Sequence, residues 1–89
     1  MILVTTRQYE KKAKKFFQNH TQLKQKYRSV VARLTENFRH PSLKLHRLKG
    51  NLSEFLAVSL DYKYRIVLLI EIVQDQIILV DIGSHDEVY

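Results

Sequence analysis

Three short stretches of the chain carry side chains that can transfer protons or bind an anion. They are KLHRLKG at 44–50, YKYRIVLL at 62–69 and DIGSHDEVY at 81–89, and they contain His46, Arg65 and His85. Histidine can take up or release a proton near neutral pH because its unperturbed pKa is about 6.5. Arginine offers a planar fork of N–H donors that matches a phosphate or carboxylate. Brought together, these three side chains could perform acid–base chemistry on an anionic substrate.

The first third of the chain reads as a strand followed by a helix. MILVTT at 1–6 is apolar and β-branched, which predicts a short strand. Thr6 is placed to cap a helix over 7–20. In that segment the apolar side chains recur at the spacing of one helix face: Tyr9, Ala13, Phe16 and Phe17.

A second amphipathic helix is predicted from Thr21, its expected N-cap, to the residues before Pro41. Its apolar face comprises Leu23, Tyr27, Val30, Val31, Leu34 and Phe38. Proline disfavours helical backbone in the residue that precedes it, so we expect the helix to end before His40.

After Leu43 the apolar period changes from that of a helix to that of strands. Strands are predicted around 44–49, 55–60, 64–73 and 77–82, with Ile78, Val80 and Ile82 on one face of the last one. Gly50–Asn51 and residues 74–76 are the expected turns, and Tyr62 and Tyr64 are expected to pack. The order of elements predicts an α+β domain over 1–89, with a short first strand, a helical hairpin and a mostly antiparallel sheet of about four further strands.

Alternation along these strands allows the candidate side chains to share the sheet face that the helices leave free. If Leu43 and Leu45 point to the helices, His46 points away from them. With a suitable register between strands, Arg65 and His85 lie on that same face.

Charge is distributed unevenly along the chain. Residues 1–50 hold 13 of the 15 Lys and Arg against two acids, a charge of +11, whereas residues 51–89 hold two cations against seven acids, a charge of −5. The basic half suggests a polyanionic partner, either nucleic acid or an acidic protein segment, or else a solvated lysine-rich helix face. Both interpretations stay open on composition alone.

Cysteine is absent, which excludes a disulfide framework and a thiolate zinc site. No stretch has the features of a signal peptide, and the apolar run IVLLI is far short of the ~20 residues that span a bilayer. We therefore expect a cytoplasmic protein without membrane partners.

The chain resembles the RelE/ParE superfamily of bacterial toxin–antitoxin toxins. The resemblance covers the whole length: the short first strand, the basic helical hairpin, LHRLKG, the strand with YRIVLLI and the closing IGSHDEVY. It implies a RelE-like fold and a cognate acidic antitoxin. The RelE-type branch of the superfamily comprises metal-independent messenger-RNA endonucleases, many of them acting on the ribosome, and the ParE-type branch inhibits DNA gyrase.

The resemblance assigns roles to the three candidates. RNA cleavage without a metal needs a base for the 2′-hydroxyl proton, positive charge at the phosphate and an acid for the leaving 5′-oxygen. Arg65 matches the phosphate-stabilising arginine of nuclease members, and His85 matches an acid or base in similar tails. His46 matches a position where some members carry an acid–base histidine. The alternatives are an Arg65 paired with Glu54 or Glu71, and histidines that only cap or face solvent.

Other candidates surround these three. Lys44, Arg47 and Lys49 are expected to bind RNA phosphates, or else to form an ordinary basic strand edge. Tyr89 is expected to stack on a base or donate through its hydroxyl, and Asp86 to orient His85. Four histidines without clustered spacing predict no metal site, and no cofactor is implied.

The favoured prediction is thus a toxin that cleaves mRNA, with messenger and ribosomal RNA as partners. A ParE-type gyrase inhibitor without nuclease activity and an inactive binding module are the two alternatives. A pair of histidines favours RNA cleavage because inhibition of gyrase requires no proton transfer.

Overall fold

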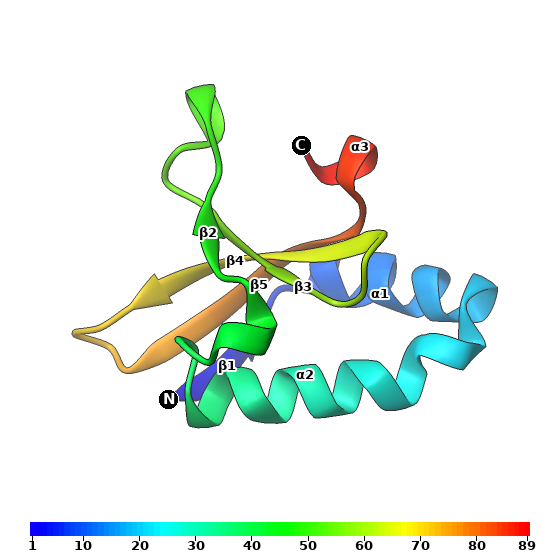
Figure 1. Cartoon of the computed structure of the whole chain (residues 1–89), viewed down its shortest axis with the longest axis horizontal. Helices are drawn as coiled ribbons and strands as arrows, with labels where there is room; N and C mark the ends of the chain where they lie inside the picture. The colour runs from blue at the N-terminus through cyan, green and yellow to red at the C-terminus, as the bar shows by residue number, and fades with distance from the viewer.

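The computed structural model describes all 89 residues, and its elements follow the predicted order (Figure 1). Strand β1 is followed by two long helices, and then by a meander of strands and a short last helix. The bounds are β1 Ile2–Thr5, α1 Arg7–Asn19, η1 Thr21–Leu23, α2 Lys24–Glu36, η2 Pro41–Leu43, β2 His46–Arg47, η3 Gly50–Leu52, β3 Leu56–Ser59, β4 Tyr64–Glu71, β5 Gln76–Ser84 and α3 His85–Val88. No helix is both long and apolar enough to span a membrane.

The strands form one five-stranded sheet in the order β1-β5-β4-β3-β2. Only β1 pairs in parallel, with β5, and the other three pairings are antiparallel. The predicted α+β fold with a mostly antiparallel sheet is therefore confirmed.

The N-cap predictions for the two long helices had opposite outcomes. Thr6 caps α1, since its hydroxyl oxygen accepts the backbone N–H of Tyr9 at 3.0 Å. The prediction for Thr21 was wrong because this residue begins the 3₁₀ turn η1, and α2 starts at Lys24 without a side-chain cap.

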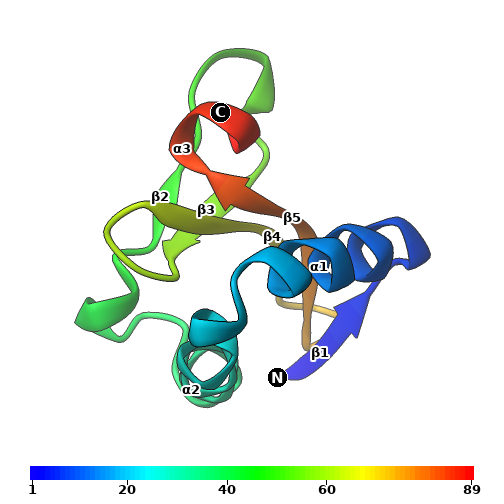
Figure 2. The ribbon, with the colours of Figure 1, turned by 90° about the vertical axis from the view of Figure 1, so that its right-hand side faces the viewer.

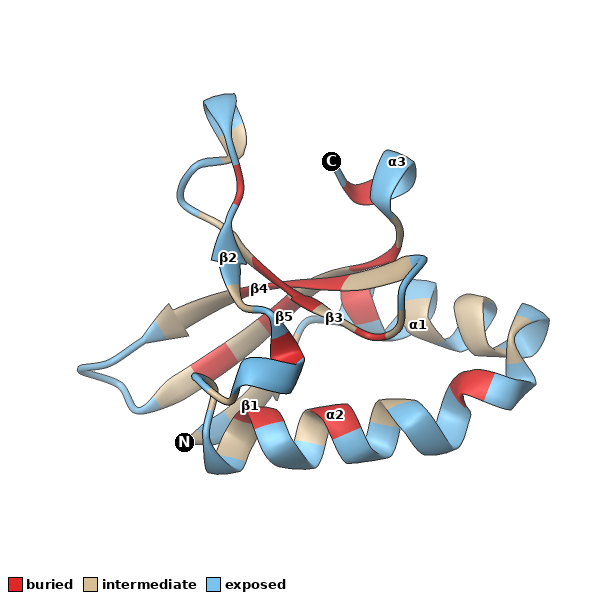
Figure 3. Cartoon of the chain, viewed as in Figure 1, coloured by how far each residue is buried: buried red, intermediate tan, exposed pale blue.

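Both long helices cover the same face of the sheet (Figures 1 and 2). The main core lies between the two helices and the sheet, and buried residues are drawn red in Figure 3. The cluster comprises Tyr9, Leu23, Val30, Leu34, Leu43, Val58, Leu60, Ile66, Leu68, Ile77, Leu79 and Ile82.

The predicted face of β5 is wrong in part because of a β-bulge. Val67 pairs with Asp81 but Leu68 pairs with Leu79, so Val80 is an extra residue on β5. The extra residue shifts the alternation by one, and the core receives Ile77, Leu79 and Ile82, all fully buried, in place of Ile78 and Val80. Val80 instead packs against a second cluster.

The face expected to be free is partly covered. Two segments rise from it: residues 48–55, which contain η3, and α3 (Figure 1). Under them lies the small second cluster of Leu48, Ala57, Val67 and Val88. The expected tight turn at Gly50–Asn51 is thus a longer excursion, in which Gly50 adopts a positive φ of 68°.

Candidate active site

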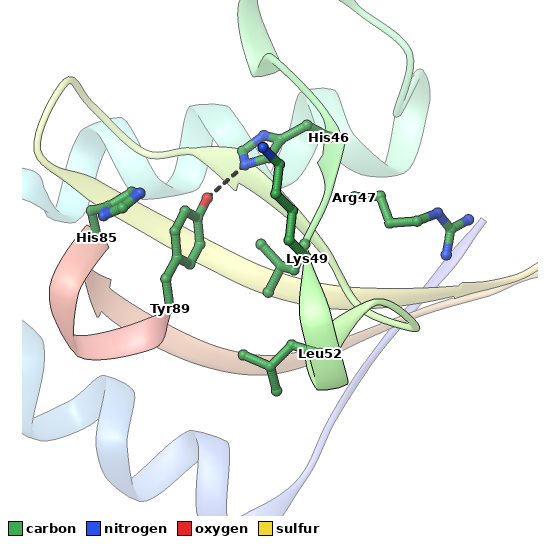
Figure 4. Close-up of a pocket in the computed structure, with 7 residues that line it drawn as sticks. His46, Arg47, Lys49, Leu52, His85 and Tyr89 are labelled. Carbon is green, nitrogen blue, oxygen red and sulfur yellow. Dashed lines mark hydrogen bonds between the residues drawn. The ribbon is translucent and has the colours of Figure 1, made fainter.

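A pocket of about 400 Å³ lies between the two segments that rise from the sheet (Figure 4). One wall is formed by β2 and the residues after it, and the other by α3 and the residue that follows it. The lining side chains are His46, Arg47, Leu48, Lys49, Leu52, His85 and Tyr89. The structure therefore brings both predicted histidines and Tyr89 together, although 38 intervening positions separate His46 from His85 along the sequence.

The backbone of Lys44 fixes the protonation pattern of His46. His46 Nδ1 lies 2.9 Å from the carbonyl oxygen of Lys44, and a carbonyl can only accept, so Nδ1 carries the hydrogen. In the neutral ring Nε2 then has the free lone pair. Lys44 presents its carbonyl from a left-handed backbone conformation, with φ of 52°. This role of Lys44 could not be predicted from the sequence because it belongs to the backbone carbonyl and not to the side chain.

Tyr89 lies between the two histidines (Figure 4). Its hydroxyl is 2.7 Å from His46 Nε2, and since Nε2 is an acceptor in the neutral ring, the hydroxyl donates. Burial raises the pKa of the Tyr89 hydroxyl, and the nearby Arg65 guanidinium only partly opposes this. Tyr89 therefore keeps its proton at neutral pH and holds a hydroxyl group against the basic nitrogen of His46.

His85 packs on the other side of the same ring. The centroids of His85 and Tyr89 are 4.1 Å apart in a T-shaped arrangement. His85 is the first residue of α3, so the expectation that it continues the alternation of β5 was wrong. Its Nδ1 lies 3.6 Å from Asp86 Oδ1, longer than a hydrogen bond but close enough for an ion pair when the imidazole is protonated.

A capping box holds α3, and with it His85 and Tyr89, in place. Glu87 N–H donates to the Ser84 hydroxyl at 3.4 Å, and Ser84 N–H donates to Glu87 Oε1 at 2.9 Å. This capping box has a sequence signature, Ser at the N-cap and Glu three residues later, which was not among the predictions. Gly83 adds close packing: a Cβ there would lie 3.3 Å from Glu87 Cβ and Val88 Cγ1.

We predict that acidification loosens α3 through Glu87. The hydrogen bond from the Ser84 backbone, and then that involving its side chain, lowers the pKa of the Glu87 carboxyl. A lowered folded-state pKa stabilises the fold above the unfolded value, and this contribution disappears as pH falls through the lowered pKa. In an NMR pH titration the amide shifts of Val88 and Tyr89 should therefore move in acid.

The matched control is Glu87→Gln, which can still accept the Ser84 N–H bond but does not titrate. Movement shared by both proteins comes from groups other than Glu87, and identical curves in the two would disprove the role of Glu87.

Arg65 does not line this pocket but borders it. Its Nη1 donates to the carbonyl oxygens of Asp61 at 2.6 Å and Tyr64 at 3.1 Å. The alternative pairing with Glu54 or Glu71 does not occur, because no ion pair includes Arg65. Its charge, and then its contact with the hydroxyl, lowers the pKa of Tyr89, and Nη1 is the nitrogen that backbone carbonyls hold. The guanidinium thus lies beside the pocket with no acidic partner.

The three predicted phosphate-binding cations do not all line the pocket. Lys49 and Arg47 line the pocket, although Arg47 points away from Tyr89 in Figure 4 and donates from Nη1 to the Ser53 carbonyl at 2.8 Å. Lys44 lines a neighbouring groove. No group of three His, Asp or Glu side chains is arranged to hold a metal ion.

The fold is shared with solved bacterial toxins. A metal-bound toxin from Helicobacter pylori is 29% identical, with a TM-score of 0.82 over 100% of this chain and 99% of that one. A conserved hypothetical protein from the same organism is 32% identical over the same shares of the chains, with a TM-score of 0.68. The YoeB–YefM toxin–antitoxin heterotetramer from Staphylococcus aureus is 19% identical, with a TM-score of 0.73 over 96% and 97%, a likeness of fold alone. No family model matches the chain, and no curated protein matches it by sequence.

Proposed function

Because the chain belongs to the RelE/ParE superfamily of toxins, we propose that it is the toxin of a toxin–antitoxin pair and that it cleaves messenger RNA without a metal, on the ribosome. The observation that carries the proposal is the cluster of His46, Tyr89 and His85 around one pocket. A gyrase-binding protein would have no use for two histidines at either side of a hydroxyl group.

His46 is suited to be the general base. Its Nδ1–H is committed to the Lys44 carbonyl, so Nε2 is the nitrogen that can take a proton. The Tyr89 oxygen, 2.7 Å from Nε2, marks where a substrate hydroxyl would sit. We infer that the 2′-hydroxyl of the cleaved nucleotide replaces Tyr89 there and passes its proton to His46 as its oxygen attacks the phosphorus.

His85 is suited to be the general acid. Its imidazole lies on the far side of Tyr89 from His46. The Asp86 carboxylate lies 3.6 Å from Nδ1 and can pair with the ring when the ring is protonated. As the bond from phosphorus to the 5′-oxygen breaks, that oxygen takes the proton of His85. Arg65 neutralises the charge that develops on the phosphate. The products are a 2′,3′-cyclic phosphate and a 5′-hydroxyl, and the two histidines end in exchanged protonation states.

The antitoxin is proposed to be acidic, because residues 1–50 carry a charge of +11. Its binding would neutralise the surface around the pocket and exclude messenger and ribosomal RNA.

The direct test is primer extension on a message in a purified translation system. The proposal predicts new breaks with the wild-type protein and none with His85→Ala. An intact message with folded wild-type protein, together with blocked supercoiling by gyrase, would instead support the ParE-type alternative.

Tyr89 offers a prediction of its own. Phenylalanine keeps the ring against His85 and removes only the hydroxyl that the substrate displaces from His46, so Tyr89→Phe should change kcat by about tenfold or less, the worth of one hydrogen bond. Tyr89→Ala also removes the ring that separates the two imidazoles and should cost more. The rates of single-turnover cleavage by the two variants are compared. Equal losses of rate would show that only the hydroxyl of Tyr89, and not its ring, contributes to cleavage.

A further inference from the structure

A second depression, of about 480 Å³, lies beside the pocket. Its walls come from α2, from the end of η2 and from the β3–β4 turn, which lie together on one side of the sheet in Figure 2. We define the basic groove by five of its lining side chains: Lys26, Arg33, Lys44, Tyr62 and Arg65.

The cations of the basic groove have no anionic partners. None of the ion pairs in the structure includes any of the four. The single acid in the lining, Asp61, uses its carboxylate to accept the backbone N–H groups of Lys63 and Tyr64 at 2.9 and 2.8 Å. Arg33 is held only by a neutral group, the Ser42 hydroxyl at 3.0 Å. The groove is therefore a concave surface with positive charge left to be neutralised by a ligand.

The basic groove and the pocket share no lining residue, but two residues of the groove also act on the pocket. The backbone carbonyl of Lys44 fixes His46, while its side chain lines the groove. Arg65 lines the groove and lowers the pKa of Tyr89 in the pocket. A chain molecule that leaves the pocket past Lys44 or Arg65 would thus meet the cations of the groove.

Tyr62 adds an aromatic surface at the rim. The expectation that both tyrosines of this region pack was wrong for Tyr62, which is 91% exposed. Tyr64 does pack, against Phe16 and His20 at 5.1 and 4.8 Å. An exposed ring beside a row of cations is the combination that binds single-stranded nucleic acid, by stacking on a base and pairing with phosphates.

We propose that the basic groove binds the single-stranded RNA that flanks the cleaved bond, with backbone phosphates on Lys26, Arg33 and Lys44 and one base on Tyr62. This inference rests on the proposed function and extends it to a second subsite. RNA is favoured over an acidic peptide because every base offers a planar face to Tyr62, whereas the carboxylates of a peptide pair only with the cations.

The test measures binding of 2′-O-methyl RNA, which cannot be cleaved because its nucleophile is blocked. A trinucleotide that fills only the pocket is compared with a longer single strand. Lys26→Ala/Arg33→Ala should weaken binding of the longer strand about tenfold and reduce its salt slope by about 1.4, or 0.7 per lost phosphate contact. Tyr62→Ala should weaken it about fivefold, the low end for one stacked base. Neither variant should change binding of the trinucleotide.

The matched control is Lys11→Ala/Lys14→Ala, which removes two exposed charges from α1 outside both sites. If the control and groove variants lose the same affinity for the longer strand, the groove is not a binding site, and the proposed nuclease activity is unaffected. Equal affinity of the wild-type protein for the trinucleotide and the longer strand would also overturn the groove. Binding of polyglutamate that competes with RNA and depends on Lys26 and Arg33 but not on Tyr62 would reassign the groove to an acidic protein segment. Absence of binding to either RNA would overturn the groove, while primer extension in the translation system decides the proposed function separately.

Discussion

His46→Ala is expected to lower the rate of RNA cleavage by about 10²- to 10⁴-fold, the usual contribution of a positioned general base. The reason is geometric. The Lys44 carbonyl takes the Nδ1 hydrogen, and Nε2 faces the place where the Tyr89 oxygen now lies. Alanine leaves nothing at that place to accept a proton.

The fold should survive this change because His46 is exposed and lies outside both apolar clusters. Circular dichroism and single-turnover cleavage on the same preparation separate activity from stability. His40→Asn is the matched control. It removes a histidine outside the pocket but keeps a side-chain acceptor for the Ser42 N–H, which His40 now accepts at 3.1 Å. If the His46→Ala protein cleaves RNA at a rate within a fewfold of the wild-type rate, His46 is not the base.

Arg65→Ala is expected to cost about 10²- to 10³-fold in kcat, as for other preorganised donors to developing charge. Arg65→Lys should recover only part of this, because an ammonium group keeps the charge but lacks the planar fork. Loss of the bonds to the Asp61 and Tyr64 carbonyls should also lower the free energy of unfolding, by about 1 kcal/mol for each bond.

The pKa of Tyr89, followed by spectroscopic titration, separates the effect of Arg65 on the pocket from its effect on the fold. The Arg65 charge lowers the pKa of Tyr89, so its removal should raise that pKa further above the ordinary value, and lysine should partly restore it. An unchanged Tyr89 titration in Arg65→Ala would show that the guanidinium does not act in the pocket.

Periodicity was sufficient to predict most of the fold. The spacing of Tyr9 and Leu34 with their neighbours located the two helices, and both side chains are buried under the sheet. Thr6 was identifiable because capping is local chemistry. The bulge at Val80 was not identifiable, since a run of apolar residues does not reveal which one is left unpaired.

The candidate site was predictable by residue type but not by arrangement. His46, His85 and Tyr89 meet because the edge strand β2 and the helix α3 border the same face of the sheet, and that juxtaposition depends on long-range register. The Ser84–Glu87 capping box was readable, whereas the Lys44 carbonyl and the exposure of Tyr62 were not, because neither depends on a sequence pattern.

The most direct test of the account is the chemistry of the cut ends. A message carrying a single 2′-deoxynucleotide at the cleavage position is compared with the all-ribose message in the purified translation system. The proposed mechanism predicts a 2′,3′-cyclic phosphate and a 5′-hydroxyl from the ribose message, and no cut at the deoxynucleotide. Cleavage of the deoxy message, or 5′-phosphate ends, would mean that water and not the 2′-hydroxyl attacks, and would contradict the roles given to His46 and His85.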